Sequence, residues 1–152
     1  SLTSEYAIKD NLQEEMLRIL LKRFIILCTR IAREKFSVSP EREKAFDMVR
    51  QFYVLVDNHF KEKKMVQDYA DMLHRSPKTL SNLFTTCGLP SPLRIIHERI
   101  EAEAKRLLLY SQKSAKEITE ILGFEDQATF SRFFKKMTGE SVSEYRKREK
   151  QE

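Results

Sequence analysis

The chain contains a pattern that recurs after 49 or 50 residues, and this repeat constrains its fold more than any other feature. VQDYADML (66–73) is matched 49 residues later by AKEITEIL (115–122), with apolar residues at the same places. SPKTLSNLF (76–84) is matched 50 residues later by DQATFSRFF (126–134). Each half contains two segments with helical spacing of apolar residues, separated by a three- or four-residue turn. The sequence therefore predicts two helix-turn-helix units in tandem.

Capping residues and a glycine indicate where these helices begin and end. The N-caps and capping boxes are Ser76 before Pro77, Ser91 before Pro92, Asp126, Ser114 with Glu117, and Ser141 with Glu144. Gly123 stands where the first helix of the second half must stop and turn. We therefore expect helix-turn-helix units at about 65–88 and 114–138. A linker helix at about 92–110 would hold them roughly 25–30 Å apart.

The second helix of each unit has one apolar and one polar face. The apolar faces contain Leu80, Leu83, Phe84 and Cys87 in the first unit and Phe130, Phe133, Phe134 and Met137 in the second. The opposite faces contain Lys78, Ser81, Asn82, Thr85 and Thr86, and then Ala128, Ser131, Arg132, Lys135 and Lys136. A polar helix face is usually only solvated. Its occurrence twice, each time on the second helix of such a unit, favours contact with a DNA groove.

The residue types on these polar faces suit DNA. Arg132 can donate two hydrogen bonds to a guanine edge, and Asn82 can pair similarly with adenine. The small residues Ala128, Ser131 and Thr85 let the backbone approach a groove closely. Cationic Lys78, Lys135 and Lys136 suit phosphates or the groove edge. Two such helices about 34 Å apart, one turn of DNA, would enter successive major grooves.

Residues 5–36 are predicted to form one long amphipathic helix. Its apolar residues follow the spacing of a coiled-coil seam, Leu17, Leu20, Phe24, Leu27 and Ile31. So apolar a helix must be covered by a second copy, by the rest of the chain, or by something outside this chain. We assign residues 1–38 to a dimerisation or connector helix and residues 39–152 to a DNA-binding domain.

A further helix is expected to begin with Ser39 as N-cap and Pro40 as its first residue. One face would contain Phe46, Val49, Phe52, Tyr53, Val56 and Phe60. The charged run 61–64 that follows is predicted to be a solvated connector. The fold class expected from all these elements is all-α.

Composition excludes several classes of protein. The net charge of +5 is compatible with a polyanionic partner. The longest apolar run, around 19–28, is too short to span a bilayer, and no signal peptide is recognisable. The two cysteines, Cys28 and Cys87, are expected to be reduced core residues of a cytosolic protein. The three histidines lack metal-ligand spacing, so we expect neither an enzyme nor a cofactor.

At these residues the sequence resembles the DNA-binding domain of the AraC/XylS family of bacterial transcription regulators, from about Phe46 to Lys147. The second unit follows the family signature at Ile118, Gly123, Phe124, Asp126, Phe130, Arg132, Phe134, Lys135, Gly139, Ser141, Tyr145 and Arg146. The run 103–108 resembles the family's linker helix. Thr119 and Val142 depart from the usual alanine and proline. The loop 88–92 is one residue longer than usual, which could rotate the units relative to each other.

The resemblance implies a sequence-specific regulator that reads two successive major-groove segments of double-stranded DNA. Position by position, the implied base-reading residues are Lys78, Ser81, Asn82, Gln127, Ala128, Ser131 and Arg132. Phosphate contacts are expected from Thr85, Lys113, Ser114, Lys135 and Lys136. Homodimerisation through residues 5–36 and contact with RNA polymerase are further expectations, in the bacterial cytosol and not at a membrane.

Family members commonly have a separate effector-binding or dimerisation domain ahead of this module. With only residues 1–45 in that place, the chain is expected to lack that domain. The alternative interpretation is a helical protein-interaction module that uses residues 5–36, with the tandem units as scaffold.

Overall fold

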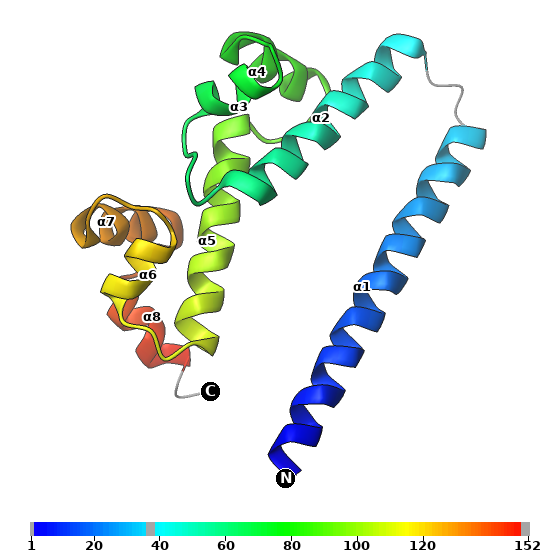
Figure 1. Ribbon diagram of the computed structural model, residues 1–152. Helices are drawn as coiled ribbons and strands as arrows, with labels where there is room; N and C mark the ends of the chain where they lie inside the picture. The colour runs from blue at the N-terminus through cyan, green and yellow to red at the C-terminus, as the bar shows by residue number, and fades with distance from the viewer. Residues whose placement is uncertain (1, 36–38, 150–152) are drawn as a thin grey trace. The chain divides into compact units, whose positions relative to one another are not determined.

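The computed structural model of the protein describes residues 2–35 and 39–149, with side chains from 16–32 and 39–149 (Figure 1). It divides into two compact units, Ser1–Glu43 and Lys44–Glu152. The regular structure of the described ranges is entirely helical, in eight helices. The all-α fold class, with two helix-turn-helix subdomains joined by a linker helix, is therefore confirmed.

The predicted long N-terminal helix is confirmed as α1, Leu2–Lys35, which begins three residues earlier than expected. Its described apolar side chains are exposed to solvent, and Phe24 for example is 63% exposed. All five residues of the predicted seam belong to this exposed set. The expectation that Cys28 is a core residue is wrong, because it lies on this solvated helix as a free thiol. Cys87 is also a free thiol, but it is half-buried against the core.

The next helix, α2 (Pro40–His59), begins as predicted, with the Ser39 hydroxyl accepting from the N–H of Arg42 at 3.4 Å. Four of the six residues predicted for its apolar face are buried, Val49, Phe52, Val56 and Phe60. The other two residues of this face, Phe46 and Tyr53, are 53% and 40% exposed. The core covers only one narrow stripe of α2, and Tyr53 lies beside that stripe, where its ring still touches Phe52 and Phe84.

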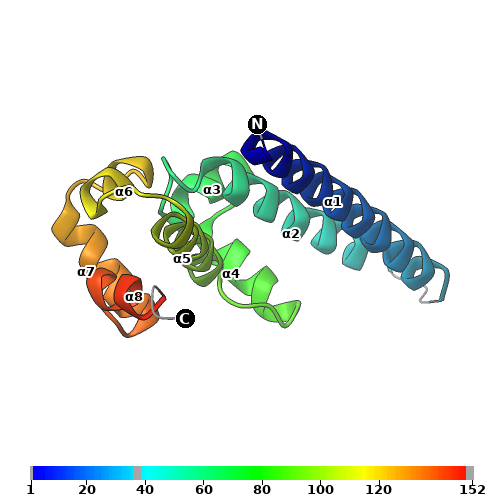
Figure 2. The ribbon, with the colours of Figure 1, turned by 90° about the horizontal axis from the view of Figure 1, so that it is seen from below.

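Six further helices complete the fold. They are α3 (Val66–Met72), α4 (Pro77–Thr86), α5 (Pro92–Tyr110), α6 (Ala115–Ile121), α7 (Gln127–Thr138) and α8 (Val142–Glu149). The predicted linker helix is α5, which contacts α3 and α4 and also α6, α7 and α8 (Figures 1 and 2). At 1.5 Å per residue it is about 28 Å long. It therefore carries one helix-turn-helix unit toward each end.

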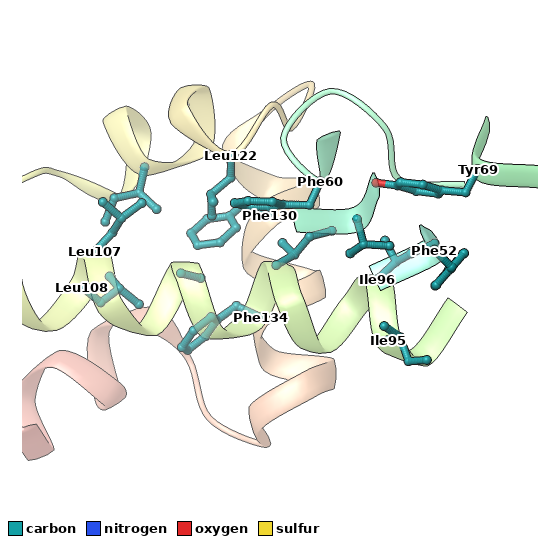
Figure 3. Packing of buried hydrophobic residues seen from close by; sticks show 14 of the residues in the cluster. Phe52, Phe60, Tyr69, Ile95, Ile96, Leu107, Leu108, Leu122, Phe130 and Phe134 are labelled. Carbon is teal, nitrogen blue, oxygen red and sulfur yellow. The ribbon is translucent and has the colours of Figure 1, made fainter. Parts of the chain in front are cut away.

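A single buried cluster runs through both helix-turn-helix units (Figure 3). Four residues of α5, Ile96, Ile100, Leu107 and Leu108, belong to it. So do the fully buried pairs Leu80 and Phe84 of α4 and Phe130 and Phe134 of α7. The two helix-turn-helix units therefore share one core, and α5 is its centre.

The run 61–64 was predicted to be a solvated connector, and this is wrong for two of its residues. Lys61 and Lys64 are half-buried, and the ammonium of Lys64 lies 5.0 Å from the ring centroid of Phe124. These residues link α2 to α3, yet they pack against the turn of the second unit. A sequence pattern could not show this proximity, because it depends on how α5 folds the second unit back onto the end of α2.

Candidate nucleic-acid interface

In the first unit, α3 ends in a tight turn that leads into α4. The N–H groups of Leu73, His74 and Arg75 donate to carbonyls of α3 at 2.9–3.1 Å. His74 has φ +53, in the left-handed region that few side chains adopt. The hydroxyl of Ser76 then accepts from the N–H of Thr79 at 3.1 Å and caps α4.

The second unit repeats this geometry bond for bond. The N–H groups of Leu122, Gly123 and Phe124 donate to carbonyls of α6 at 2.9–3.1 Å. Gly123, with φ +69, occupies the position of His74. The carboxylate of Asp126 accepts from the N–H of Thr129 at 2.7 Å and caps α7. This hydrogen bond is the main cause of the lowered pKa of Asp126, to which the Arg132 guanidinium also contributes. The repeat seen in the sequence is thus a repeat of structure.

The outward face of α4 carries the residues predicted for it. Lys78, Ser81 and Asn82 are exposed on consecutive turns, with Thr85 one turn further on. The hydroxyl of Thr85 donates to the carbonyl of Ser81 at 2.9 Å, and that of Thr86 donates to the carbonyl of Asn82 at 2.8 Å. These two hydroxyl protons are engaged, so Thr85 can donate to a DNA phosphate, which only accepts hydrogen bonds, by giving up its bond to the carbonyl of Ser81.

The outward face of α7 is more strongly charged. Gln127, Ala128 and Arg132 are exposed, while Ser131 is half-buried. The guanidinium of Arg132 approaches the hydroxyl of Thr129 at 3.4 Å, which leaves most of its donors available to a ligand. Lys135 and Lys136 are exposed in the last turns of the helix, a favourable place for cations.

Contacts from α5 hold α7 in place. The rings of His97 and Phe133 meet edge to face with centroids 5.3 Å apart. Burial lowers the pKa of His97, and the nearby charge of Lys136 lowers it further. Since Phe130 and Phe134 are fully buried beneath the same helix, the polar face of α7 is fixed outward.

The predicted phosphate contacts at Lys113 and Ser114 lie in the loop ahead of α6, and both residues are exposed. A capping box engages the main chain here, because the N–H of Ser114 donates to the Glu117 carboxylate at 2.7 Å. The Ser114 hydroxyl accepts from the N–H of Glu117 at 3.2 Å but keeps its own proton. Arg146 of α8 donates to the carbonyl of Lys113 and holds the loop in position.

One exposed cation was missed by reasoning from the sequence. Arg75 lies in the turn of the first unit, directly before the N-cap of α4. By the hydrogen bonds of the turn Arg75 corresponds to Phe124, but directly before the cap the second unit has Glu125, so the two units present opposite charges next to their caps. The sequence signal for Arg75 is its place directly before the predicted N-cap Ser76. In the described part of the chain no group of three potential metal ligands occurs.

Comparisons with known proteins agree with this geometry. The helix-turn-helix domain family matches residues 69–148. The helix-turn-helix-type transcriptional regulator YisR of Bacillus subtilis is 30% identical over 122 residues, which cover 80% of this chain and 41% of YisR. The chain therefore spans less than half of that relative's length.

Two solved structures share the fold. The C-terminal domain of AraT, a response regulator from Geobacillus stearothermophilus, is 29% identical and superposes with a TM-score of 0.60, over 66% of this chain and 84% of that one. The DNA-binding domain of the transcriptional factor AdpA, solved in complex with a target DNA, is 23% identical with a TM-score of 0.54. That superposition covers 67% of this chain and 88% of the AdpA chain.

Proposed function

Since the chain belongs to the helix-turn-helix family of AraC-type transcription regulators, we propose that it binds double-stranded DNA by inserting α4 and α7 into successive major grooves. Sequence-specific DNA binding in transcription regulation is the function that the family and the fold assign to this segment. The observation that carries the proposed geometry is the duplicated outward face, presented twice on one continuous core. A protein-interaction scaffold would not need an exposed polar face on the second helix of both units, so we do not favour that alternative.

Base reading is proposed for seven exposed or half-exposed residues on these two faces. They are Lys78, Ser81, Asn82, Gln127, Ala128, Ser131 and Arg132. Arg132 and Asn82 have the side chains that recognise guanine and adenine edges by paired hydrogen bonds. The proposed phosphate contacts are Thr85, Lys113, Ser114, Lys135 and Lys136, which flank these reading faces.

The salt dependence of binding tests this proposal directly. Fluorescence anisotropy of labelled mixed-sequence duplexes, titrated at several salt concentrations, should show affinity falling with a log–log slope of about 0.9 per phosphate contact. A chain whose affinity barely responds to salt, or that does not bind duplex at all, would contradict the proposal. An apolar partner interface would give that flat response.

We also propose that the chain forms a homodimer through α1. Leu17, Leu20 and Phe24 lie at seam spacing and are each more than half exposed, at 71%, 55% and 63%. Leu27 and Ile31 extend the seam and are 47% and 52% exposed. An apolar stripe of this length is costly to leave in water, and pairing with a second copy would remove it.

Replacing both Leu20 and Phe24 by lysine should convert the dimer into a monomer, because charged residues at seam positions oppose pairing. Light scattering measures the mass of each species. Arg18→Lys and Arg30→Lys, which conserve charge on the same helix, are the matched control and should leave the mass unchanged. An unchanged mass for the double-lysine variant would reject this seam.

Three further proposals concern the location of the protein, a second partner and its activity. No helix of the described residues is long and apolar enough to cross a bilayer. We place the protein in the bacterial cytosol, where its DNA would be. We propose RNA polymerase as a further partner, since a regulator bound near a promoter acts on that enzyme. The chain is proposed to act by binding alone, without an enzymatic activity.

A further inference from the structure

The short segment 60–64 between α2 and α3 is here called the connector, and it is distinct from the N-terminal helix. It is anchored to the first helix-turn-helix unit. The hydroxyl of Tyr69, on α3, donates to the carbonyl of Lys63 at 2.8 Å. Burial is the main cause that raises the pKa of Tyr69 to about 12, so this donor keeps its proton. The N–H groups of Glu62 and Lys63 both donate to the carbonyl of His59 at the end of α2. The connector is thus a defined turn and not a loose tether.

The same connector touches the turn of the second unit. A Cβ placed on Gly123 would lie 1.9 Å from the carbonyl oxygen of Lys61 and 3.1 Å from the Nζ of Lys64. In the first unit the equivalent residue is His74, which has a similar φ and carries a full side chain. The left-handed backbone alone therefore does not demand glycine here. The close approach of the connector does.

Side chains reinforce this contact. The ammonium of Lys64 donates to the carbonyl of Lys61 at 2.7 Å and lies over the ring of Phe124, next to Gly123. Burial lowers the pKa of Lys64. On the other side, the guanidinium of Arg99 from α5 stacks 4.1 Å from the ring centroid of Phe60. Arg99 also donates to the Asp57 carboxylate at 2.7 Å, which ties the end of α2 to α5.

We propose that the connector and Gly123 form a clamp that fixes the rotation and separation of α4 and α7 before DNA is bound, so that the chain selects the spacing between its two half-sites. The inference rests on the proposed function, because spacing matters only if both helices read DNA. Gly123 is then a positioning residue. It contacts no base, but it lets the first unit seat directly on the turn that precedes α7.

The consequence for DNA follows from helical geometry. One extra base pair between half-sites moves the second half-site by about 3.4 Å and rotates it by about 35°. A clamped chain cannot follow this displacement and loses the base contacts of one helix, which is worth about 5- to 150-fold in affinity. A chain held only by α5 could bend or twist, and would lose less.

A distance measurement tests the clamp without DNA. Spin labels at Thr86→Cys and Lys136→Cys, in a chain with Cys28→Ala and Cys87→Ala, report the separation of the two recognition helices by double electron–electron resonance. The labelled chain is diluted with an excess of unlabelled chain, so that pairs of labels on two copies of the proposed dimer do not contribute, and we then expect one narrow distance distribution. Gly123→Ala should broaden or shift it, whereas Gly139→Ala should not. Gly139 has φ +82 with open space around it, so its variant has the same backbone strain without the clash.

Lys64→Ala keeps the test decisive if Gly123→Ala fails to fold, since it removes the cation from the same contact and leaves the turn intact. Its matched control is the exposed Lys116→Ala. The clamp would be overturned if Gly123→Ala gave the same distance distribution as its control. If Gly123→Ala does not fold, the same comparison is made between Lys64→Ala and its control.

Binding to spaced duplexes then connects the clamp to specificity. Using the duplex that the unaltered chain selects from a random pool, spacers longer by one or two base pairs should weaken its binding about 5- to 150-fold. For the clamp variants this loss should shrink to about twofold or threefold, the scale of losing less than one base contact. An equal spacing penalty in clamp and control variants would contradict the proposal. A narrow distance distribution in a chain that selects no duplex would reject the proposed function and leave the clamp standing.

Discussion

The two helix-turn-helix units share one skeleton but present different chemistry on it. Their turns make equivalent hydrogen bonds, and Phe84 and Phe134 are buried at equivalent positions. On the outside, Asn82 of the first unit stands where the second has Arg132. Thr85 and Thr86, whose hydroxyls bond back to α4, stand where the second unit has Lys135 and Lys136.

This difference teaches which positions fix the fold and which are free to set the function. The buried and capping positions keep their roles in both units, because the turn cannot form without them. The exposed positions differ, with one cation in α4, Lys78, and three in α7, Arg132, Lys135 and Lys136. We therefore expect the second unit to supply more of the electrostatic affinity and the first unit to depend more on neutral contacts.

The largest expected effect tests the shared skeleton. Phe84→Ala and Phe134→Ala should each lower the free energy of unfolding by about 3–5 kcal/mol, the usual cost of removing a buried phenylalanine. Both should unfold in a single transition in urea, because the two residues belong to one core. Two separate transitions would show that the units are independent and would break the comparison.

The next effect concerns the reading faces. Arg132→Ala should weaken binding at the preferred site by about 1–3 kcal/mol and relax selection at one base position. Asn82→Ala should relax a different position in the other half-site. Competition binding with preferred and random duplexes measures both. Equal losses on the two kinds of duplex would show that Arg132 contacts only phosphate.

A smaller effect separates the two N-caps. Ser76→Ala should cost about 1 kcal/mol of stability at any pH from 3 to 7, because a hydroxyl does not titrate there. The lowered pKa of Asp126 means that its ionised form stabilises the folded chain. This stabilisation is full above the unfolded pKa of about 3.9 and is lost as the pH falls through the lower folded value.

Asp126→Ala should therefore destabilise the chain clearly at pH 7 and progressively less below about pH 4. Thermal melts across this range, with Ser76→Ala as the matched variant, measure the difference. A pH-independent cost for Asp126→Ala would mean that its carboxylate charge does not contribute to the cap.

The smallest effect concerns salt. Lys135→Ala and Lys136→Ala should each reduce the log–log salt slope of duplex binding by about 0.9 if each lysine neutralises one phosphate. Thr85→Ala and Thr86→Ala should leave the slope unchanged, since a neutral side chain neutralises no phosphate and so releases no counterion. A slope that responds equally to the threonines would remove the proposed electrostatic asymmetry between the units.

Much of this fold could be predicted from the sequence, because short-range rules govern it. The repeat located both turns, and the serine and aspartate caps located the starts of α4, α5 and α7. The predictions for Cys28, Lys61 and Lys64 were wrong, because the burial of these residues depends on which helix surfaces pack together. Phe46 has the same place in the apolar pattern of α2 as the buried Phe52, yet it is 53% exposed.

The contact between Lys61 and Gly123 shows the same limit more clearly. Gly123 could be assigned to a turn because the first helix of the second unit must stop there, and this is confirmed. That a carbonyl from 62 residues earlier packs against it could not be inferred, because the approach is set by the tertiary path of α5. The assignment of base-reading residues stays a prediction, since DNA contacts depend on a partner.

The central claim is that one chain reads DNA with two helices, α4 and α7. Selection of bound duplexes from a random pool tests it most directly. It should be run with the unaltered chain, Asn82→Ala and Arg132→Ala in parallel. The account predicts two blocks of preferred bases with centres about 10–10.5 base pairs apart, one relaxed by each substitution. A single block, or two blocks that respond only to Arg132→Ala, would contradict it.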